Sequence, residues 1–190
     1  MPSATLNLAQ DYLSLSDYEN AEKYFRETIS LYPQHRMGLF RMEGKVILGR
    51  GEIALAKGDY AQALKCAEEA LIMYEKADAK KYIARGLKLK AEALAGMGRM
   101  DEATGLMEEA LKLAQQIGNP PTLWQIHHGF GLLFERRGDL QKASRHHAAA
   151  IALIEATASK LNDSSVKNTL LTSAQTNTIY DAYTRTKSAL

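Results

Sequence analysis

Apolar residues along this chain recur every three or four positions, in segments that end at short polar turns. Two such segments flank residue 58, and their apolar members are Val46, Ile47, Leu48, Ile53 and Leu55 before it and Tyr60, Leu64, Leu71, Ile72 and Tyr74 after it. This spacing is typical of amphipathic α-helices. One pair of such helices cannot bury both of its apolar faces, so the pattern predicts pairs that stack on one another.

The helix pairs repeat along the chain. Four turns align at Ser16-Asp17, Gly58-Asp59, Gly98-Arg99 and Gly138-Asp139, and they are separated by 42, 40 and 40 residues. A small residue precedes each turn by seven positions and another follows it, in the pairs Ala9 and Ala21, Gly51 and Ala63, Ala91 and Ala103, and Gly131 and Ala143. Because small side chains let two backbones approach, we expect these residues where the two helices of each pair touch.

Proline and glycine mark the ends of the predicted helices. Pro33 is expected to end the second helix of the first pair. The sequence Gly118-Asn119-Pro120 predicts a helix end, a cap and the first position of the next helix. Gly44 and Gly49 fall inside a helical pattern and argue against a straight, continuous helix over residues 36–57.

The turn with its flanking small residues resembles the tetratricopeptide repeat (TPR). The first pair is nearest the family pattern, with Tyr12 before the turn, Ala21 and Phe25 after it, and Pro33 closing it. The resemblance covers residues 3–161 and implies an all-α, right-handed TPR-like solenoid of four antiparallel helix pairs plus C-terminal closing helices. The spacing exceeds the common 34 residues. It is similar to that in the TPR regions of bacterial signalling proteins and kinesin light chains.

The resemblance also suggests how the chain is divided. Residues 1–162 are expected to hold four repeats, at about 3–35, 36–77, 78–118 and 119–162, and residues 163–190 to form capping helices. Asp163 or Ser164 can cap the first of these, and Ile179 belongs to the apolar stripe of a second. This tail resembles the segment that closes TPR regions in bacterial multidomain regulators, which implies the C-terminal part of a larger regulator or a free-standing relative of that part.

Composition narrows the classes of partner and location. The 24 Lys and Arg residues nearly balance the 22 Asp and Glu residues, for a formal net charge of +2, which speaks against nucleic acid or an acidic membrane as partner. The single cysteine, Cys66, excludes an internal disulfide and a multi-cysteine metal site. Residues 1–10 do not form a secretory signal, and the longest apolar run, 148–154, is too short to span a membrane. We expect a cytoplasmic protein.

Two histidine pairs and one thiol are the candidates for chemistry. His127-His128 and His146-His147 fall on the two helices of the fourth pair, but adjacent helical residues point about 100° apart and cannot both face one ion. No carboxylate or thiol stands three or four residues from either pair to complete a metal site. We therefore expect packed, hydrogen-bonded imidazoles at His127 and His147, a structural Cys66, no metal, no cofactor and no enzymatic activity.

The first helix of each pair should line the concave groove of the solenoid. Counting from the aligned turns places eleven side chains there: Lys45, Leu48, Glu52, Leu55, Arg85, Lys88, Glu92, Gln125, His128, Glu135 and Arg136. TPR adaptors that bind chaperone C-terminal carboxylates use Lys, Arg and Asn. Here Glu52 and Glu92 stand at the corresponding turns, so we do not expect an acidic tail as ligand.

These observations favour a protein–protein interaction or regulatory module that binds a partner segment in the groove, as part of a larger signalling protein. The alternative is a free-standing TPR adaptor or homo-oligomeric scaffold. The first helix carries Leu6, Leu8, Tyr12 and Leu13 with no helix before it. This apolar edge predicts a homodimer through the first repeat.

Overall fold

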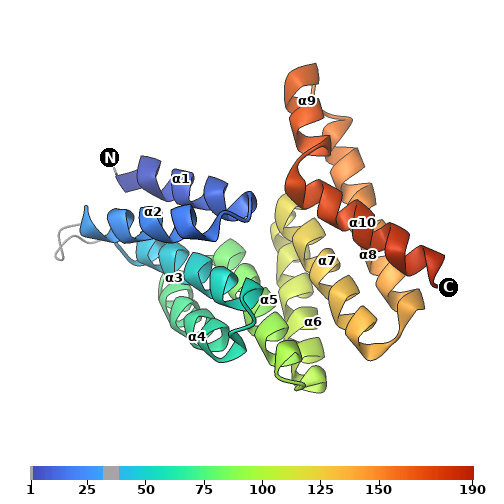
Figure 1. Cartoon of the computed structure of the whole chain (residues 1–190), viewed down its shortest axis with the longest axis horizontal. Helices are drawn as coiled ribbons and strands as arrows, with labels where there is room; N and C mark the ends of the chain where they lie inside the picture. Colours follow the sequence, from blue (N-terminus) through green and yellow to red (C-terminus); the bar gives the residue numbers. More distant parts are fainter. Residues whose placement is uncertain (1, 32–38) are drawn as a thin grey trace.

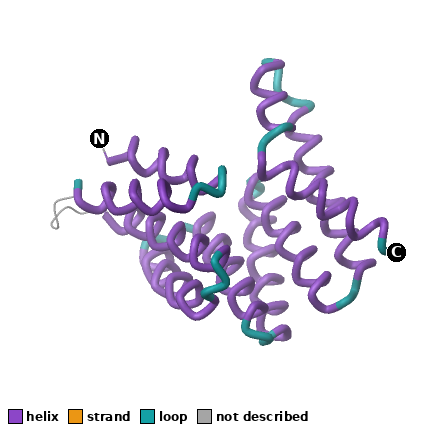
Figure 2. The backbone as a smooth tube through the Cα atoms, viewed as in Figure 1, coloured by secondary structure: helices purple, strands orange, loops and turns teal. Residues whose placement is uncertain are grey.

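The computed structural model describes residues 2–31 and 39–190, and these residues form ten helices and no strand. Figures 1 and 2 show the helices stacked side by side along the chain, with the two termini at different ends. The helices are α1 (Pro2–Ser14), α2 (Tyr18–Ser30), α3 (Leu39–Ala56), α4 (Tyr60–Lys76), α5 (Lys80–Gly96), α6 (Met100–Ile117), α7 (Pro120–Arg137), α8 (Leu140–Ala158), α9 (Ser164–Leu171) and α10 (Ala174–Ser188).

The first eight helices form four pairs, each joined by a tight turn at a predicted position. The second helix of each pair is N-capped at Asp17, Asp59, Arg99 and Asp139, and the three aspartates accept a hydrogen bond from the backbone N–H three residues on. The residue before each cap has a positive φ, as glycine in three turns and as Ser16 in the first. Glycine adopts this conformation without steric cost, which is why three of the four aligned turns contain it.

The small residues lie where the pattern places them. Ala21, Ala63, Ala103 and Ala143 are each fully buried in the second helix of their pair. Opposite Ala63, a Cβ added at Gly51 would lie 2.6 Å from a Leu89 methyl and 2.8 Å from the Cβ of Cys66. Such spacing is closer than atoms pack, so the helix contact depends on the missing side chain.

Gly44 and Gly49, which argued against a continuous helix over residues 36–57, do not interrupt the helix in the part that the structure describes. α3 is one continuous helix from Leu39 to Ala56. Its glycines instead receive aromatic rings: the space of a side chain at Gly49 is filled by the Phe25 ring, and that at Gly44 by Tyr74. The packing energy of two buried rings outweighs the cost of about 1 kcal/mol for glycine in a helix.

The remaining boundary signals agree with the structure in the part of the chain that it describes. Gly118 ends α6 in the left-handed conformation, Asn119 caps α7 through Thr122, and Pro120 is its first residue. Asp163 caps α9. The expected helix end at Pro33 lies outside the described residues.

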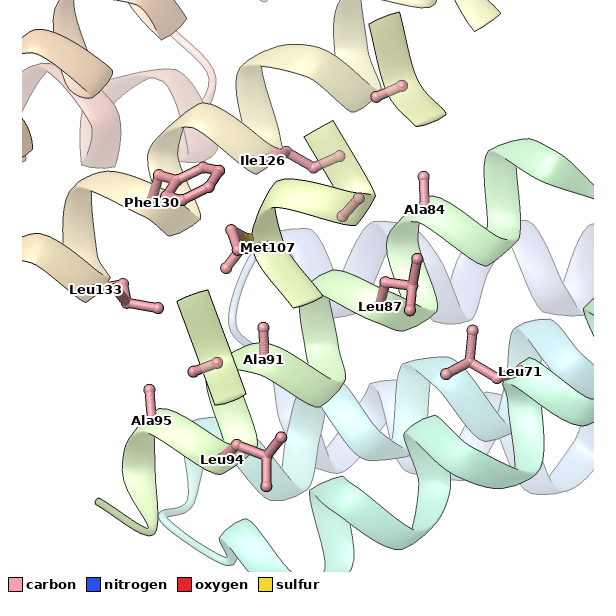
Figure 3. Packing of buried hydrophobic residues seen from close by; sticks show 13 residues of the cluster. Leu71, Ala84, Leu87, Ala91, Leu94, Ala95, Met107, Ile126, Phe130 and Leu133 are labelled. Carbon is pink, nitrogen blue, oxygen red and sulfur yellow. The ribbon is translucent and has the colours of Figure 1, made fainter. Parts of the chain in front are cut away.

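The core is continuous along the array, within the pairs and between them. Its largest cluster joins Leu71 of α4, residues of α5 and α6, and Ile126, Phe130 and Leu133 of α7. Figure 3 shows these side chains meeting along the seam between neighbouring ribbons. Each pair thus buries its apolar faces against the next pair, which is how a repeat array is stabilised.

The last two helices behave differently from each other. α9 has no buried residue, whereas α10 buries Thr176, Ile179, Ala182 and Thr186. α10 packs on α8 and also contacts α7 (Figure 1). It therefore occupies the position that the first helix of a further pair would take.

Candidate partner-binding cleft

The first helices of the second, third and fourth pairs line one cleft of about 430 Å³. The side chains that they contribute are Glu52 and Ala56 of α3, Arg85 and Lys88 of α5, and Gln125 and His128 of α7. The two residues of α5, like those of α7, are three positions apart and share one helix face. Five of the eleven side chains expected in the groove are thus brought together here.

Both ends of the chain complete this cleft. Residues around the α1–α2 turn line one side, namely Gln10, Leu13, Ser14, Ser16 and Tyr18. Residues of α10 line another, namely Ala174, Gln175, Thr178 and Ile179. The cleft is therefore bounded by segments more than 150 residues apart in the sequence.

Ion pairs partly satisfy the charges on the cleft wall. Arg85 Nη2 lies 3.0 Å from Glu52 Oε1 and joins α5 to α3. Lys88 Nζ lies 2.7 Å from Glu92 Oε1, one turn along α5. These side chains are about a quarter exposed or less, apart from Glu52 at 31%. The wall consequently presents paired charges of both signs and no isolated cationic patch.

A smaller pocket of about 80 Å³ holds three more of the expected residues. Leu55, Glu92 and Arg136 line it together with Ala95, Gly129, Leu132 and Leu133. This pocket is largely apolar, and it shares α3, α5 and α7 with the larger cleft.

The last three expected residues lie outside both hollows. Lys45 lies over the Tyr82 ring, with Nζ 5.1 Å from the ring centroid. Leu48 is 1% exposed in the core, because α3 turns this side chain toward α4 and α5. Glu135 bonds to His147 and Arg185. Placing Leu48 in the groove was therefore wrong, since a core side chain cannot reach a ligand.

The histidines form two cross-helix pairs between α7 and α8. His127 Nδ1 lies 3.1 Å from His146 Nδ1, and His128 Nδ1 lies 3.2 Å from His147 Nδ1. The ring of His146 also stacks on Phe130, with centroids 4.6 Å apart. The expectation of packed, hydrogen-bonded imidazoles is confirmed for His127 and His147.

Burial keeps these imidazoles neutral. It lowers the pKa of His128 from 6.5 to about 3, with smaller contributions from His147, Lys88 and Arg185. It lowers the pKa of His146 to about 4, aided by His127 and His147. The pKa values of His127 and His147 are also lowered, chiefly by burial, although Glu135 opposes the shift at His147.

Within residues 2–31 and 39–190, no group of three or more His, Cys, Asp or Glu side chains is arranged to hold a metal ion. Cys66 is buried and accepts a hydrogen bond from Gln62 Nε2 at 3.3 Å. Burial raises the pKa of its thiol. A buried, protonated thiol is a packing residue rather than a nucleophile.

Besides the cleft residues around the α1–α2 turn, the sequence did not reveal two features of this region. The contribution of α10 was missed because the polar composition of residues 157–190 suggested a simple cap. The apolar stripe at Ile179 was the signal of a buried face. The contact between Glu135 and His147 was missed because it joins different helices at a separation of 12 residues, which no spacing rule identifies.

An all-α array of stacked helix pairs with a cleft on its inner helices defines a helical-repeat solenoid. The sequence matches tetratricopeptide repeats over residues 3–35 and 82–156. The chain belongs to the tetratricopeptide repeat family, whose fold is a scaffold for protein–protein interaction. A search of curated proteins finds no match.

Solved structures share this fold at low sequence identity. A Rap protein complexed with Competence and Sporulation Factor superposes with a TM-score of 0.68 and 13% identity, over 95% of this chain and 52% of that one. BtubC (BKLC) from P. vanneervenii gives 0.60 and 17%, over 96% and 78%. A putative kinesin light chain from Podosopora anserina with TPR-like repeats gives 0.58 and 14%, over 100% and 97%. The chain thus spans about half the length of the Rap protein. Among its described helices, none has the length and apolar character needed to cross a bilayer.

Proposed function

We propose that the chain binds a segment of a partner protein in the 430 Å³ cleft. The observation that carries this proposal is the convergence of Glu52, Arg85, Lys88, Gln125 and His128 from three successive inner helices on one hollow. Repeat solenoids use their extended concave surfaces for binding. The Rap protein of similar fold is complexed with Competence and Sporulation Factor, which supports a ligand-binding role for this architecture.

The charges of the wall bear on the kind of segment that fits. Arg85 and Lys88 already have the carboxylates of Glu52 and Glu92 as partners. A strongly acidic tail would have to displace these carboxylates and would lie beside them. A segment of mixed, low charge meets no such cost, because its polar groups can use the amide and imidazole side chains instead.

The biological setting is part of the same proposal. A binding module of this kind acts as a regulator within a larger signalling protein, without enzymatic activity of its own. The alternative is a free-standing adaptor or homo-oligomeric scaffold. The two are distinguished by reading the gene upstream of the codon for Met1, since an open frame there would favour the larger protein.

The binding site is tested by selecting peptides from a displayed library on the purified chain. Affinities of the selected peptides are then measured by fluorescence polarisation with Lys88→Glu and with Lys65→Glu, an equal charge reversal at an exposed position of α4. We expect Lys88→Glu to weaken binding at least tenfold and Lys65→Glu to leave it unchanged. Equal affinities for both variants would place the binding surface elsewhere.

A further inference from the structure

A chain of hydrogen bonds leads from the cleft to α10. His128, on the cleft wall, meets His147 through their Nδ1 atoms at 3.2 Å. His147 Nε2 lies 2.8 Å from Glu135 Oε1, and Arg185 Nη2 of α10 donates to Glu135 Oε2 at 2.8 Å. His147 is fully buried, so no water competes for its ring nitrogens.

The chemistry of these groups fixes where each proton lies. The Glu135 carboxylate accepts hydrogen bonds and cannot donate them, so His147 must carry its proton on Nε2. A neutral imidazole has one N–H, which leaves Nδ1 of His147 as an acceptor. His128 must then donate from its own Nδ1. Its Nε2 is consequently an unprotonated acceptor, and it has no hydrogen-bond partner among residues 2–31 and 39–190.

The groups around His128 keep this state stable near neutral pH. The charges that face it are Lys88 of α5, Arg185 of α10 and, through His147, the carboxylate of Glu135. Burial and the two cations disfavour a further proton on the ring and lower its pKa. The free nitrogen is therefore available to a ligand as an acceptor.

We infer that the cleft binds an extended peptide backbone, with one amide N–H of the ligand donating to His128 Nε2. This rests on the proposed function and adds the chemistry of recognition. Gln125 lies one turn before His128 on α7 and lines the same cleft, and its carboxamide can both donate and accept. A peptide unit offers one N–H and one C=O, so it matches this pair of side chains. A carboxylate does not match this site, because it has no proton to donate to His128 Nε2.

The arrangement is tested by nitrogen-15 spectroscopy of the histidine-labelled chain at about pH 7.5, above the ordinary histidine range. Two-bond proton–nitrogen correlations separate protonated from bare ring nitrogens. We expect His128 with a bare Nε2 and a protonated Nδ1. A protonated Nε2 in the free protein would overturn the inference, even if the selected peptides bind at the cleft. If Lys88→Glu instead left the affinity of the selected peptides unchanged, the proposed function would be excluded. The assignment of the proton to Nδ1 of His128 would still hold.

Small probes then test the ligand class. N-methylacetamide, which carries one peptide N–H, should shift His128 Nε2 in a concentration series. N,N-dimethylacetamide lacks that N–H and should leave the signal in place, as should acetate. A larger response to acetate, to methylammonium or to dimethylacetamide than to N-methylacetamide would exclude a backbone amide as the ligand group.

A matched pair of variants tests whether Glu135 sets the proton order. Glu135→Gln replaces the carboxylate by an amide that can donate to His147, so His128 should show both tautomers. Glu92→Gln removes a carboxylate that bonds Lys88 instead, and should leave the single tautomer. An unaltered His128 signal in Glu135→Gln would show that Glu135 does not determine which ring nitrogens of His147 and His128 carry a proton.

Discussion

Gly131 lies directly against the imidazole of His147. A Cβ at position 131 would overlap the ring atoms Cε1, Nδ1 and Nε2. The absence of a side chain on α7 thus makes room for a fully buried histidine of α8, and the bond from His147 to Glu135 depends on that space.

Gly131→Ala should destabilise the chain by about 1–3 kcal/mol, because the added methyl group must displace His147 from a packed site. Gly105→Ala is the control, since Gly105 is an exposed position within α6 with open space around it. That change should raise stability by up to about 1 kcal/mol through helix propensity. Urea unfolding measures both. Equal effects of the two variants would show that the α7–α8 contact adapts without cost.

Ala143→Leu should likewise cost about 1–3 kcal/mol, because Ala143 is fully buried where α8 crosses α7. Ala152→Leu adds the same atoms at an exposed position of α8 and should stay within about 0.5 kcal/mol of the parent. Thermal melting gives the comparison. An unchanged midpoint for Ala143→Leu would mean that the close contact lies elsewhere.

Stability should fall as the pH drops below about 6.5. The folded state holds four histidines neutral, with the pKa lowered to about 3 at His128 and about 4 at His146. In the unfolded chain the histidines have their ordinary pKa, so below pH 6.5 the unfolded chain binds more protons than the folded chain. The free energy of unfolding therefore decreases progressively as the pH falls toward 4. Melting temperatures between pH 8 and pH 5 provide the test.

His146→Phe should reduce that slope, because it removes one titrating ring from a site already packed with Phe130 and Phe134. A melting temperature independent of pH from 7 to 5 would show that the histidines titrate alike in the folded and unfolded chains.

Few apolar side chains of the first repeat are exposed and could form the predicted homodimer contact. Leu6 is buried, and Tyr12 and Leu13 pack on the core beside it, while Leu8 is 37% and Leu15 69% exposed. If this edge pairs two copies, Leu15→Lys should shift sedimentation across a concentration series toward the monomer. Ile72→Lys, at an exposed position of α4, should not. Identical profiles for both variants would remove the first repeat as the dimer contact.

The repeat pattern predicted much of the fold because it consists of local signals. The cap at Asp59 and the buried alanine at Ala63 are fixed by residues within one turn of themselves. Gly49 was misjudged because its role depends on Phe25, a ring on another helix. A glycine in a helix is a weakness only when no neighbour fills the space, and sequence spacing does not contain that information.

The cleft was predicted in part for the same reason. Counting along the first helices found Arg85 and His128, which face the cleft through helix geometry alone. It could not find Gln175 of α10, because that residue reaches the cleft through the packing of Ile179 against α8. Leu48 was misplaced because α3 packs against both α4 and α5, and part of the helix face expected in the groove is buried between them.

The cleft touches both Gln10 near one end of the array and Thr178 near the other. In a linear array each pair contacts only its neighbours, so segments can unfold one after another, starting from either end. A ligand that contacts both Gln10 and Thr178 would connect the first pair directly to α10, in addition to the connection through the intervening pairs. Its binding would make the denaturation of α1–α2 and of α10 concerted, and amide hydrogen exchange of the two end segments would slow together.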